Sequence, residues 1–238
     1  MQTDVTPRVL RTPDFAADAA RFILDHAREA IAARGLFRVA LSGGNTPRAV
    51  HAELVKLAGD LPWNHVQVTF GDERCVPPQH EQSNYRMAKE SLLDPARIPD
   101  GNVFRMRGEI DPQAAADEYE AKLAAVAARF GEPRYVHDLL LLGLGEDGHT
   151  ASLFPGSPAL AETVRNVIPA TGPKPPPQRI TMTFPLLNAA RHVGFLVKGA
   201  DKLPLVEQIV AGGSPLPAAH VRPSNGAVTW IVGVEDAN

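Results

Sequence analysis

The sequence predicts an α/β fold, with a mostly parallel, Rossmann-like sheet flanked by helices on both faces. Segments with helical periodicity alternate with short apolar segments along the 238 residues, which favours parallel strands joined by helices. Residues 138–144 include four consecutive leucines, a pattern typical of a strand covered on both faces. No internal repeat or linker interrupts the alternation, so we expect a single domain over residues 1–238.

The first half of the chain is expected to begin with a helix. Thr12-Pro13-Asp14 offers a hydroxyl cap and a proline at the first helical position, and Gly35 is placed to end the helix. A second helix should start at Thr46-Pro47, directly after a glycine turn. The other elements expected here are strands at 36–41 and 66–70 and a helix at 83–93.

The second half repeats this alternation. Asp111-Pro112 is expected to cap a helix that runs to Phe130, with Gly131 ending it. Four prolines in the segment 171–178 predict a loop. The remaining elements expected here are strands at 102–106, 138–144, 193–197 and 228–232 and a helix at 203–210.

The composition argues against several classes of protein. The chain has 24 Lys and Arg against 27 Asp and Glu, a net charge of −3, which argues against a nucleic-acid binder that relies on positive charge. A single cysteine, Cys75, excludes a disulfide framework and a multi-cysteine metal site. No apolar segment approaches the roughly 20 residues that span a membrane. Residues 1–5 lack the pattern of a signal peptide, so we expect a cytoplasmic protein.

Three distinctive segments follow predicted strands, at 42–46, 71–74 and 143–150. In open parallel sheets, ligands bind beyond the carboxyl ends of the strands, so we expect the functional site to be built from these segments.

The first of these segments resembles a phosphate-binding turn. Gly43 and Gly44 allow the backbone to approach an anion, and a helix that starts at Thr46 would point its free N–H groups at that anion. The segment matches neither the P-loop nor the Gly-x-Gly-x-x-Gly pattern. On spacing alone, a tight turn before a capped helix explains it equally well.

The last segment carries the candidate catalytic residues. Asp147 and His149 are two residues apart, which suits a carboxylate that orients an imidazole, and histidine can act as a general base near neutral pH. The alternative is that His149 makes only a structural hydrogen bond. The density of glycines around the histidine favours the functional interpretation.

Charged residues near other strand ends are candidates for binding an anionic ligand. Arg74 could bind an anion in bidentate geometry, although a surface ion pair within 72–74 explains the same residues. Arg179 and Lys198 are further cations, and for Lys198 a solvated strand end is the alternative.

Other kinds of catalytic centre have little support in the sequence. The histidines show no zinc-ligand spacing, so we expect no metal and no cofactor. No Gly-x-Ser-x-Gly motif is present and no nucleophile motif surrounds Cys75, so an acyl-enzyme mechanism is not expected.

At these residues the sequence resembles the 6-phosphogluconolactonase family over nearly its whole length. The motifs that carry the resemblance lie at 41–47, 71–74, 83–85, 143–156, 179–181 and 198–199. The stretch 143–156 is the most specific of them. The resemblance implies a hydrolase of the oxidative pentose phosphate pathway that opens 6-phospho-D-glucono-1,5-lactone to 6-phosphogluconate without a required metal.

The same resemblance assigns roles to the candidate residues. His149 would be the general base that activates water, and Asp147 would hold its ring. Backbone amides near Gly43 or Gly145 would stabilise the developing oxyanion. The substrate-binding residues that it implies are Ser42, Gly43, Gly44, Asn45, Thr46, Asp72, Arg74, Gly145, Arg179 and Lys198.

A glucosamine-6-phosphate deaminase, which shares the fold and much of the motif order, is the nearest alternative. Around its histidine the deaminase pattern reads Gly-His-Ile-Ala-Phe-Asn-Glu-Pro, and the glutamate takes part in acid–base chemistry. Phe154 stands at that position here and cannot transfer a proton. Arg74 also replaces the tyrosine that usually follows Asp-Glu in the deaminase. Both differences favour the lactonase.

A sugar-phosphate sensor without catalysis is an alternative of another class. Related folds serve as effector-binding domains of bacterial regulators, which add a DNA-binding module. We expect no such module before the first strand, and His149 is present, so the enzyme is favoured. The expected partner is a phosphorylated sugar lactone rather than nucleic acid or a membrane, and we expect a monomer or small homo-oligomer.

Overall fold

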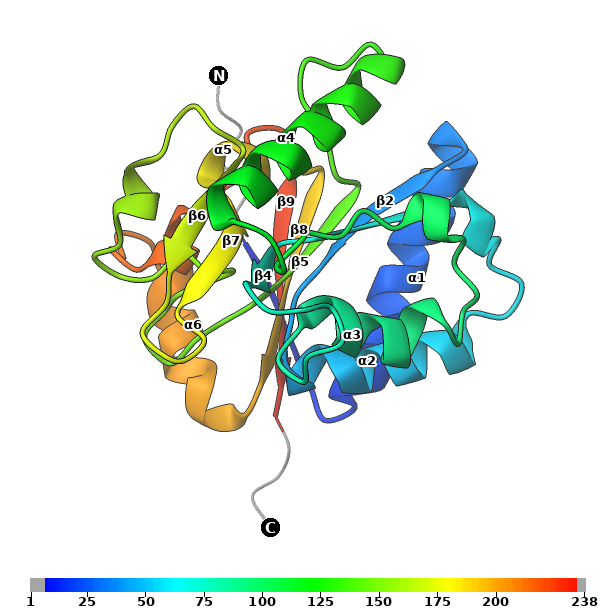
Figure 1. The fold of residues 1–238 in the computed structure, drawn as a ribbon. Helices are drawn as coiled ribbons and strands as arrows, with labels where there is room; N and C mark the ends of the chain where they lie inside the picture. The colour runs from blue at the N-terminus through cyan, green and yellow to red at the C-terminus, as the bar shows by residue number, and fades with distance from the viewer. Residues whose placement is uncertain (1–6, 235–238) are drawn as a thin grey trace.

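Six parallel strands form the central sheet, in the order β1-β9-β8-β5-β2-β3 (Figure 1). This computed structural model describes residues 7–234, so the predicted absence of a signal peptide at residues 1–5 lies outside the described residues. The parallel sheet confirms the predicted α/β class. Its strands are β1 (Arg8–Thr12), β2 (Phe37–Leu41), β3 (Val66–Phe70), β5 (Leu139–Gly143), β8 (His192–Lys198) and β9 (Ala227–Gly233).

Helices cover both faces of this sheet, with α1 and α2 on one side and α4 and α6 on the other (Figure 1). The α-helices are α1 (Phe15–Arg34), α2 (Asn45–Leu57), α3 (Asn84–Ala88), α4 (Pro112–Arg129), α5 (Phe184–Leu187) and α6 (Leu203–Val210). A π-helical turn, Lys89–Leu93, continues α3, so the helix predicted at 83–93 forms in two parts. Short 3₁₀ helices lie at Trp63–His65, Asp100–Asn102, Pro158–Ala161, Ala200–Lys202 and Pro217–His220.

Two of the predicted helix ends are confirmed. Gly35 has φ 72°, a left-handed conformation that favours glycine, and its N–H donates to the carbonyl of Ile31. Asp111 caps α4 because its carboxylate accepts the N–H of Ala114 at 2.9 Å.

The predicted start of the first helix at Thr12 is wrong. Thr12 is the last residue of β1, where it pairs with Gly233 of β9, and α1 begins only at Phe15. The Thr12 hydroxyl instead accepts the N–H of Asp14 at 3.0 Å. Pairing with a strand from the far end of the chain thus overrides a local helix-start signal.

The strand predicted at 102–106 is also wrong. Only Val103 forms a bridge, to Val68 of β3, and it directly follows a 3₁₀ turn. The N–H of Phe104 donates to the carbonyl of Val68 at 2.8 Å, after which the chain leaves the edge of the sheet. The segment therefore contacts the sheet without extending it.

The structure also contains a second, three-stranded sheet, which the sequence pattern did not predict. Its strands are β4 (Asp72–Arg74), β6 (Val167–Thr171) and β7 (Gln178–Met182), in the antiparallel order β4-β7-β6. Gly71 links the two sheets, because its N–H donates to Leu41 of β2 and its carbonyl accepts from Met182 of β7. The predicted proline-rich loop joins β6 to β7, although its end residues belong to those strands.

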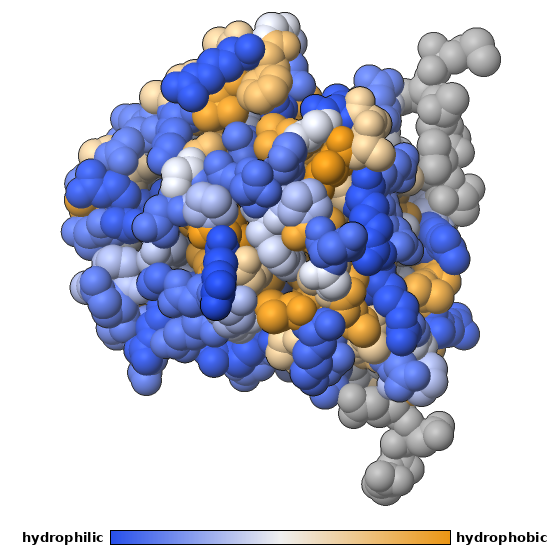
Figure 2. All heavy atoms as spheres, turned by 90° about the vertical axis from the view of Figure 1, so that its right-hand side faces the viewer, coloured by the Kyte–Doolittle hydropathy of each residue, from blue (hydrophilic) through white to orange (hydrophobic). Residues whose placement is uncertain are grey.

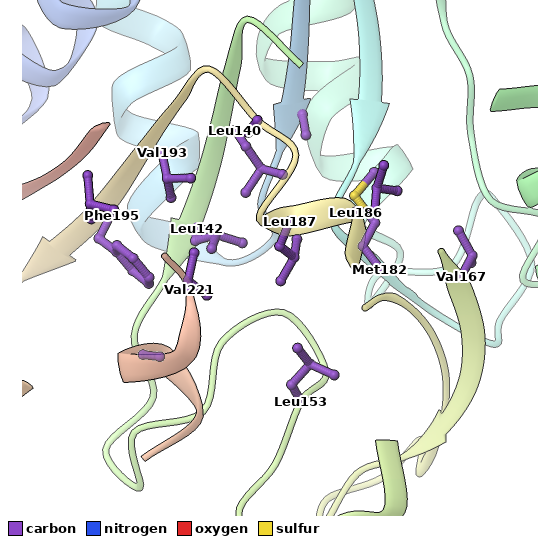
Figure 3. Packing of buried hydrophobic residues seen from close by; sticks show 14 of the residues in the cluster. Leu140, Leu142, Leu153, Val167, Met182, Leu186, Leu187, Val193, Phe195 and Val221 are labelled. Carbon is purple, nitrogen blue, oxygen red and sulfur yellow. The ribbon is translucent and has the colours of Figure 1, made fainter. Parts of the chain in front are cut away.

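The alternating side chains of the central strands divide the core into two clusters. On β5, Leu140 and Leu142 belong to the cluster beneath α4, and Leu139 and Leu141 to the cluster beneath α1. Figure 3 shows Leu140 and Leu142 beside Leu186 and Leu187 in the first cluster. All four leucines of β5 are at most 1% exposed, as expected for a strand covered on both faces.

On the face shown in Figure 2, hydrophilic residues cover most of the surface and hydrophobic residues form patches among them. Over residues 7–234, no helix is both long and apolar enough to cross a membrane.

Candidate functional site

A cleft of about 200 Å³ opens beyond the carboxyl ends of β2, β5 and β8. These strands are neighbours in the sheet, so the loops that follow them meet. The cleft is lined by most of the predicted site residues, namely Ser42, Gly43, Gly44, Asn45, Thr46, Asp72, Arg74, Gly145, His149 and Lys198. Asp147 and Arg179 lie outside this lining, and Lys202, which was not among the predicted site residues, belongs to it.

The glycine turn at 42–44 leads from β2 directly into α2. Gly44 is the N-cap residue with φ 102°, and α2 begins at Asn45 rather than at Thr46-Pro47. A glycine N-cap supplies no side-chain acceptor, so the first N–H groups of α2 lack the partner that a capping side chain would give. The N-terminus of a helix attracts anions, and this one opens into the cleft.

His149 and Asp147 contact each other beside the cleft. His149 Nδ1 lies 2.5 Å from Asp147 Oδ1, and the same oxygen accepts the backbone N–H of His149 at 3.1 Å. Burial raises the pKa of Asp147, but the hydrogen bonds from His149 outweigh burial and lower the pKa below its usual value. The carboxylate is therefore charged at neutral pH and accepts from Nδ1, which leaves Nε2 to accept a further proton.

Gly145 is required at its position by the His149 ring. A Cβ atom there would lie 2.1 Å from Nδ1 of His149 and 2.8 Å from Oδ1 of Asp147. The N–H of Gly145 donates to the carbonyl of His149 at 2.9 Å, which closes the loop. This bond corrects the expectation that the Gly145 amide could stabilise an oxyanion, because that N–H is already engaged.

Further contacts fasten the loop that carries His149. The hydroxyl of Thr150 donates to the carbonyl of Gly143 at 2.9 Å, and that of Ser152 donates to Oδ2 of Asp72 at 2.6 Å. Leu153 is fully buried in the core cluster that Figure 3 shows. Hydrogen bonds on one side and hydrophobic burial on the other thus set the position of His149.

Positive side chains from three segments converge on the cleft. Arg74 lines it while its Nη1 atom donates to the carbonyl of Gln82 at 2.8 Å. Lys198 and Lys202 line it from the end of β8 and from the turn that follows, and Lys202 Nζ donates to the carbonyl of Leu144 at 2.9 Å. Lys202 lies only four residues after Lys198, but nothing in the sequence distinguishes it from a solvated lysine, so no local signal identifies it.

Arg179 lies beside Arg74 without lining the cleft. The two residues are paired across β4 and β7, and Arg179 is 8% exposed. Its Nη1 atom is buried and has no hydrogen-bond partner within residues 7–234. Burial lowers the pKa of Arg179, and the positive charge of Arg74 lowers it further. An anion between the two arginines would supply the missing partner for this guanidinium.

Glu73 corrects the interpretation of residues 72–74 as a surface ion pair. It is 2% exposed, and its carboxylate accepts the N–H groups of Arg74, Asn84 and Tyr85 and the hydroxyl of Ser83. Burial raises the pKa of Glu73, although the backbone hydrogen bonds lower it. The sequence pattern carries no signal that this carboxylate is buried.

The ring of Phe154 packs on the ring of His149, with 4.6 Å between their centroids. An apolar ring therefore lies where the deaminase pattern has its glutamate. Among the described residues, no group of three or more His, Cys, Asp and Glu side chains is arranged to hold a metal ion.

Several known proteins are similar to this chain over most of its length. A family model described as glucosamine-6-phosphate isomerases/6-phosphogluconolactonase matches residues 11–230. A 6-phosphogluconolactonase from Synechocystis sp. is 42% identical over 208 residues, 86% of this chain and 85% of that protein. The 6-phosphogluconolactonase of Homo sapiens is 40% identical over 206 residues, 84% of this chain and 79% of that protein.

Solved structures of 6-phosphogluconolactonases have a similar fold over most of their length. The 6-phosphogluconolactonase of Trypanosoma brucei superposes with a TM-score of 0.82 at 31% identity, covering 96% of this chain and 97% of that chain. That of Thermotoga maritima gives a TM-score of 0.84 at 28% identity, covering 95% and 99%.

Proposed function

The chain belongs to the glucosamine-6-phosphate isomerase/6-phosphogluconolactonase family, its activity is that of a 6-phosphogluconolactonase of the pentose phosphate pathway, and we propose that His149 is the general base of this reaction. The observation that carries the proposal is the contact of His149 Nδ1 with the charged Asp147, beside a cleft that also holds the glycine turn. Such a pair can remove a proton from water at neutral pH.

The proposed reaction begins when Nε2 of His149 takes a proton from water as the water oxygen attacks the lactone carbonyl. Asp147 stabilises the imidazolium that forms. The tetrahedral intermediate then expels the ring oxygen, and His149 returns the proton to that oxygen to form a hydroxyl. The other product group is a carboxylic acid, which releases the remaining water proton to solvent and becomes a carboxylate, so the reaction balances with water as the only co-reactant.

The phosphate of the substrate would bind at the glycine turn. The amides of Gly43 and Gly44 and the N-terminus of α2 attract an anion there. Positive charge in the walls of the cleft comes from Arg74, Lys198 and Lys202. Arg179 pairs with Arg74 across β4 and β7 and adds a further positive charge beside it. Binding energy from the phosphate would hold the carbonyl near His149, which accelerates a reaction whose own barrier is low.

For the whole chain we propose one lactonase domain that acts in the cytoplasm as a monomer or small homo-oligomer on a phosphorylated sugar lactone. Both core clusters pack against the same six-stranded sheet, which supports the single domain. The single cysteine, which leaves the fold independent of disulfide bonds, supports a reducing compartment. Light scattering of the purified protein tests the oligomeric state.

The function is tested by adding purified protein to freshly generated 6-phosphogluconolactone and reading the product with a coupled dehydrogenase. Hydrolysis well above the uncatalysed rate is expected, and His149→Ala should lower kcat by about 10²- to 10⁴-fold. Binding of 6-phosphogluconate to His149→Ala should be nearly unchanged, and loss of binding and folding together would make His149 structural. Ammonia release from glucosamine 6-phosphate, measured in parallel, would support the deaminase instead.

A further inference from the structure

The motif Ser83-Asn84-Tyr85 carries part of the family resemblance, yet none of its residues lines the cleft. Asn84 is the first residue of α3 and is 1% exposed. A buried polar side chain near a binding site requires a reason, because its desolvation is unfavourable unless its hydrogen bonds are satisfied.

Asn84 fills the space next to the glycine turn. A Cβ atom on Gly43 would lie 1.9 Å from Oδ1 of Asn84 and 2.3 Å from its Cγ atom. Any side chain at position 43 would collide with this carboxamide. Gly43 is therefore needed because the carboxamide of Asn84 occupies the space that a side chain would take.

The orientation of the carboxamide is set by Asp72. Nδ2 of Asn84 donates to the carbonyl of Asp72 at 2.9 Å and to its carboxylate Oδ1 at 3.2 Å. Both partners accept, so the amide nitrogen faces Asp72 and Oδ1 faces Gly43. Within the described residues this buried Oδ1 atom has no hydrogen-bond partner, which shows that its position is held by the other end of the side chain.

Asn84 is itself held on two sides. Glu73 accepts its backbone N–H at 2.7 Å, and Ser83 caps α3 by accepting the N–H of Arg86. The other carboxylate oxygen of Asp72 accepts the hydroxyl of Ser152, in the segment that follows His149. A continuous chain of contacts thus joins the glycine turn, through Asn84 and Asp72, to the loop that carries the proposed base.

We propose that Asn84 is a positioning residue that sets the distance between the glycine turn and the loop of His149. This inference rests on the proposed function, in which the substrate spans the two segments with its phosphate at one and its carbonyl at the other. Asn84 does not line the cleft, so in this proposal it acts without contacting the substrate. It supports the backbone that binds the phosphate, so its loss should weaken substrate binding without unfolding the protein.

The first test is the kinetics of Asn84→Ala. KM for 6-phosphogluconolactone should rise about 10- to 100-fold, and the affinity for 6-phosphogluconate should fall by a similar factor. Neither quantity depends on the fraction of active protein, so partial unfolding alone would move neither. A KM and a product affinity within twofold of the wild type would overturn the proposal.

The second test is the coupling of Asn84 with Gly43. Gly43→Ala alone should lower kcat/KM steeply because of the collision with Asn84. In Gly43→Ala with Asn84→Ala the collision is removed, so kcat/KM should be about tenfold or more above the value expected from independent effects. Independent effects of the two substitutions would overturn the proposal.

If Gly43→Ala does not fold, Asn84→Asp tests the positioning role of Asn84 instead. It keeps the size of the side chain but presents an oxygen to the two acceptors of Asp72, so KM should rise as in Asn84→Ala; a wild-type KM would overturn the proposal. Ser91→Ala is the matched control, because it removes the partly buried hydrogen bonds of the Ser91 hydroxyl with the Met87 carbonyl and with His51, in the π-helical turn after α3 and outside the cleft lining, and should leave kcat and KM unchanged. A wild-type protein that does not open the lactone contradicts the proposed function, whereas an unchanged KM in Asn84→Ala overturns only this inference.

Discussion

The imidazole of His149 lies directly against the backbone of Gly145, so closely that a Cβ atom on that glycine would be 2.1 Å from Nδ1. The same two residues share a hydrogen bond from the Gly145 N–H to the His149 carbonyl. The glycine therefore allows a tight loop to bring the ring to Asp147, and this relationship leads to the first prediction.

Gly145→Ala should lower kcat by about 10²-fold or more while the fold is retained. The added methyl group would displace the ring from Asp147, and small displacements of a catalytic group have effects of this size. The measurement is steady-state hydrolysis of the lactone together with thermal unfolding. Gly101→Ala is the matched control, because nothing lies within 4 Å of a Cβ atom there; an equal loss in both variants would contradict the explanation.

Asp147→Asn should lower kcat by about 10²-fold with KM nearly unchanged. The amide cannot stabilise an imidazolium as a carboxylate does, and hydrogen bonds from His149 keep the pKa of Asp147 low enough for it to be charged at pH 7. The variant should not be slower than His149→Ala, since Asp147 acts through the histidine. A wild-type kcat would show that the contact is only structural.

Arg74→Ala should act mainly on KM, raising it about 10- to 100-fold, because the guanidinium is proposed to bind the phosphate. Arg74→Lys should recover part of this loss, since it keeps the charge but not the bidentate geometry. Competition by inorganic phosphate provides an independent measurement, and its inhibition constant should rise in parallel. An unchanged KM for the lactone would count against a phosphate-binding role.

The stability of the protein should fall in mild acid through His51. Burial, and secondly the charge of Arg48, lowers the pKa of His51 to about 4 in the folded state, against 6.5 in the unfolded chain. Below pH 6.5 the unfolded state binds the proton more readily, so stability is present above that pH and is lost as the pH falls towards 4. From this shift, His51 should contribute a loss of about 3 kcal/mol in the free energy of unfolding between pH 7 and pH 4.

Urea unfolding of the wild type and of His51→Gln at pH 7, 5.5 and 4.5 tests this prediction. The variant should lose less stability on acidification, because glutamine does not titrate and can still bond Ser91. Identical pH dependence in both proteins would show that other groups dominate.

The sheet could be predicted because its strands are buried on both faces and so appear as short apolar segments. Residues 139–142 are the clearest case, since four leucines in succession suit neither an amphipathic helix nor an exposed strand. The strand β1 could not be predicted in this way. Its residues Arg8–Thr12 lie at the edge of the sheet, where only Thr12 is buried, and pairing with β9 makes them a strand.

In the candidate site, the motifs could be predicted from the sequence, whereas contacts between distant segments could not. Residues 42–46 and 143–150 could be placed together because the carboxyl ends of parallel strands share one edge of a sheet. Glu73 appears in the sequence as one charged residue among three, yet it is buried and accepts four hydrogen bonds, three of them from the segment 83–85. Nothing local distinguishes such a carboxylate from a solvated one.

The sequence by itself determined the class of fold, the order of most elements, the cleft-lining glycines and the pairing of Asp147 with His149, because each depends on residues close together in the chain. Tertiary structure alone decided that Lys202 enters the cleft, that Arg179 stays behind it and that Asn84 supports Gly43. These depend on contacts between segments brought together by folding, where small differences in backbone position decide which side chain reaches the site.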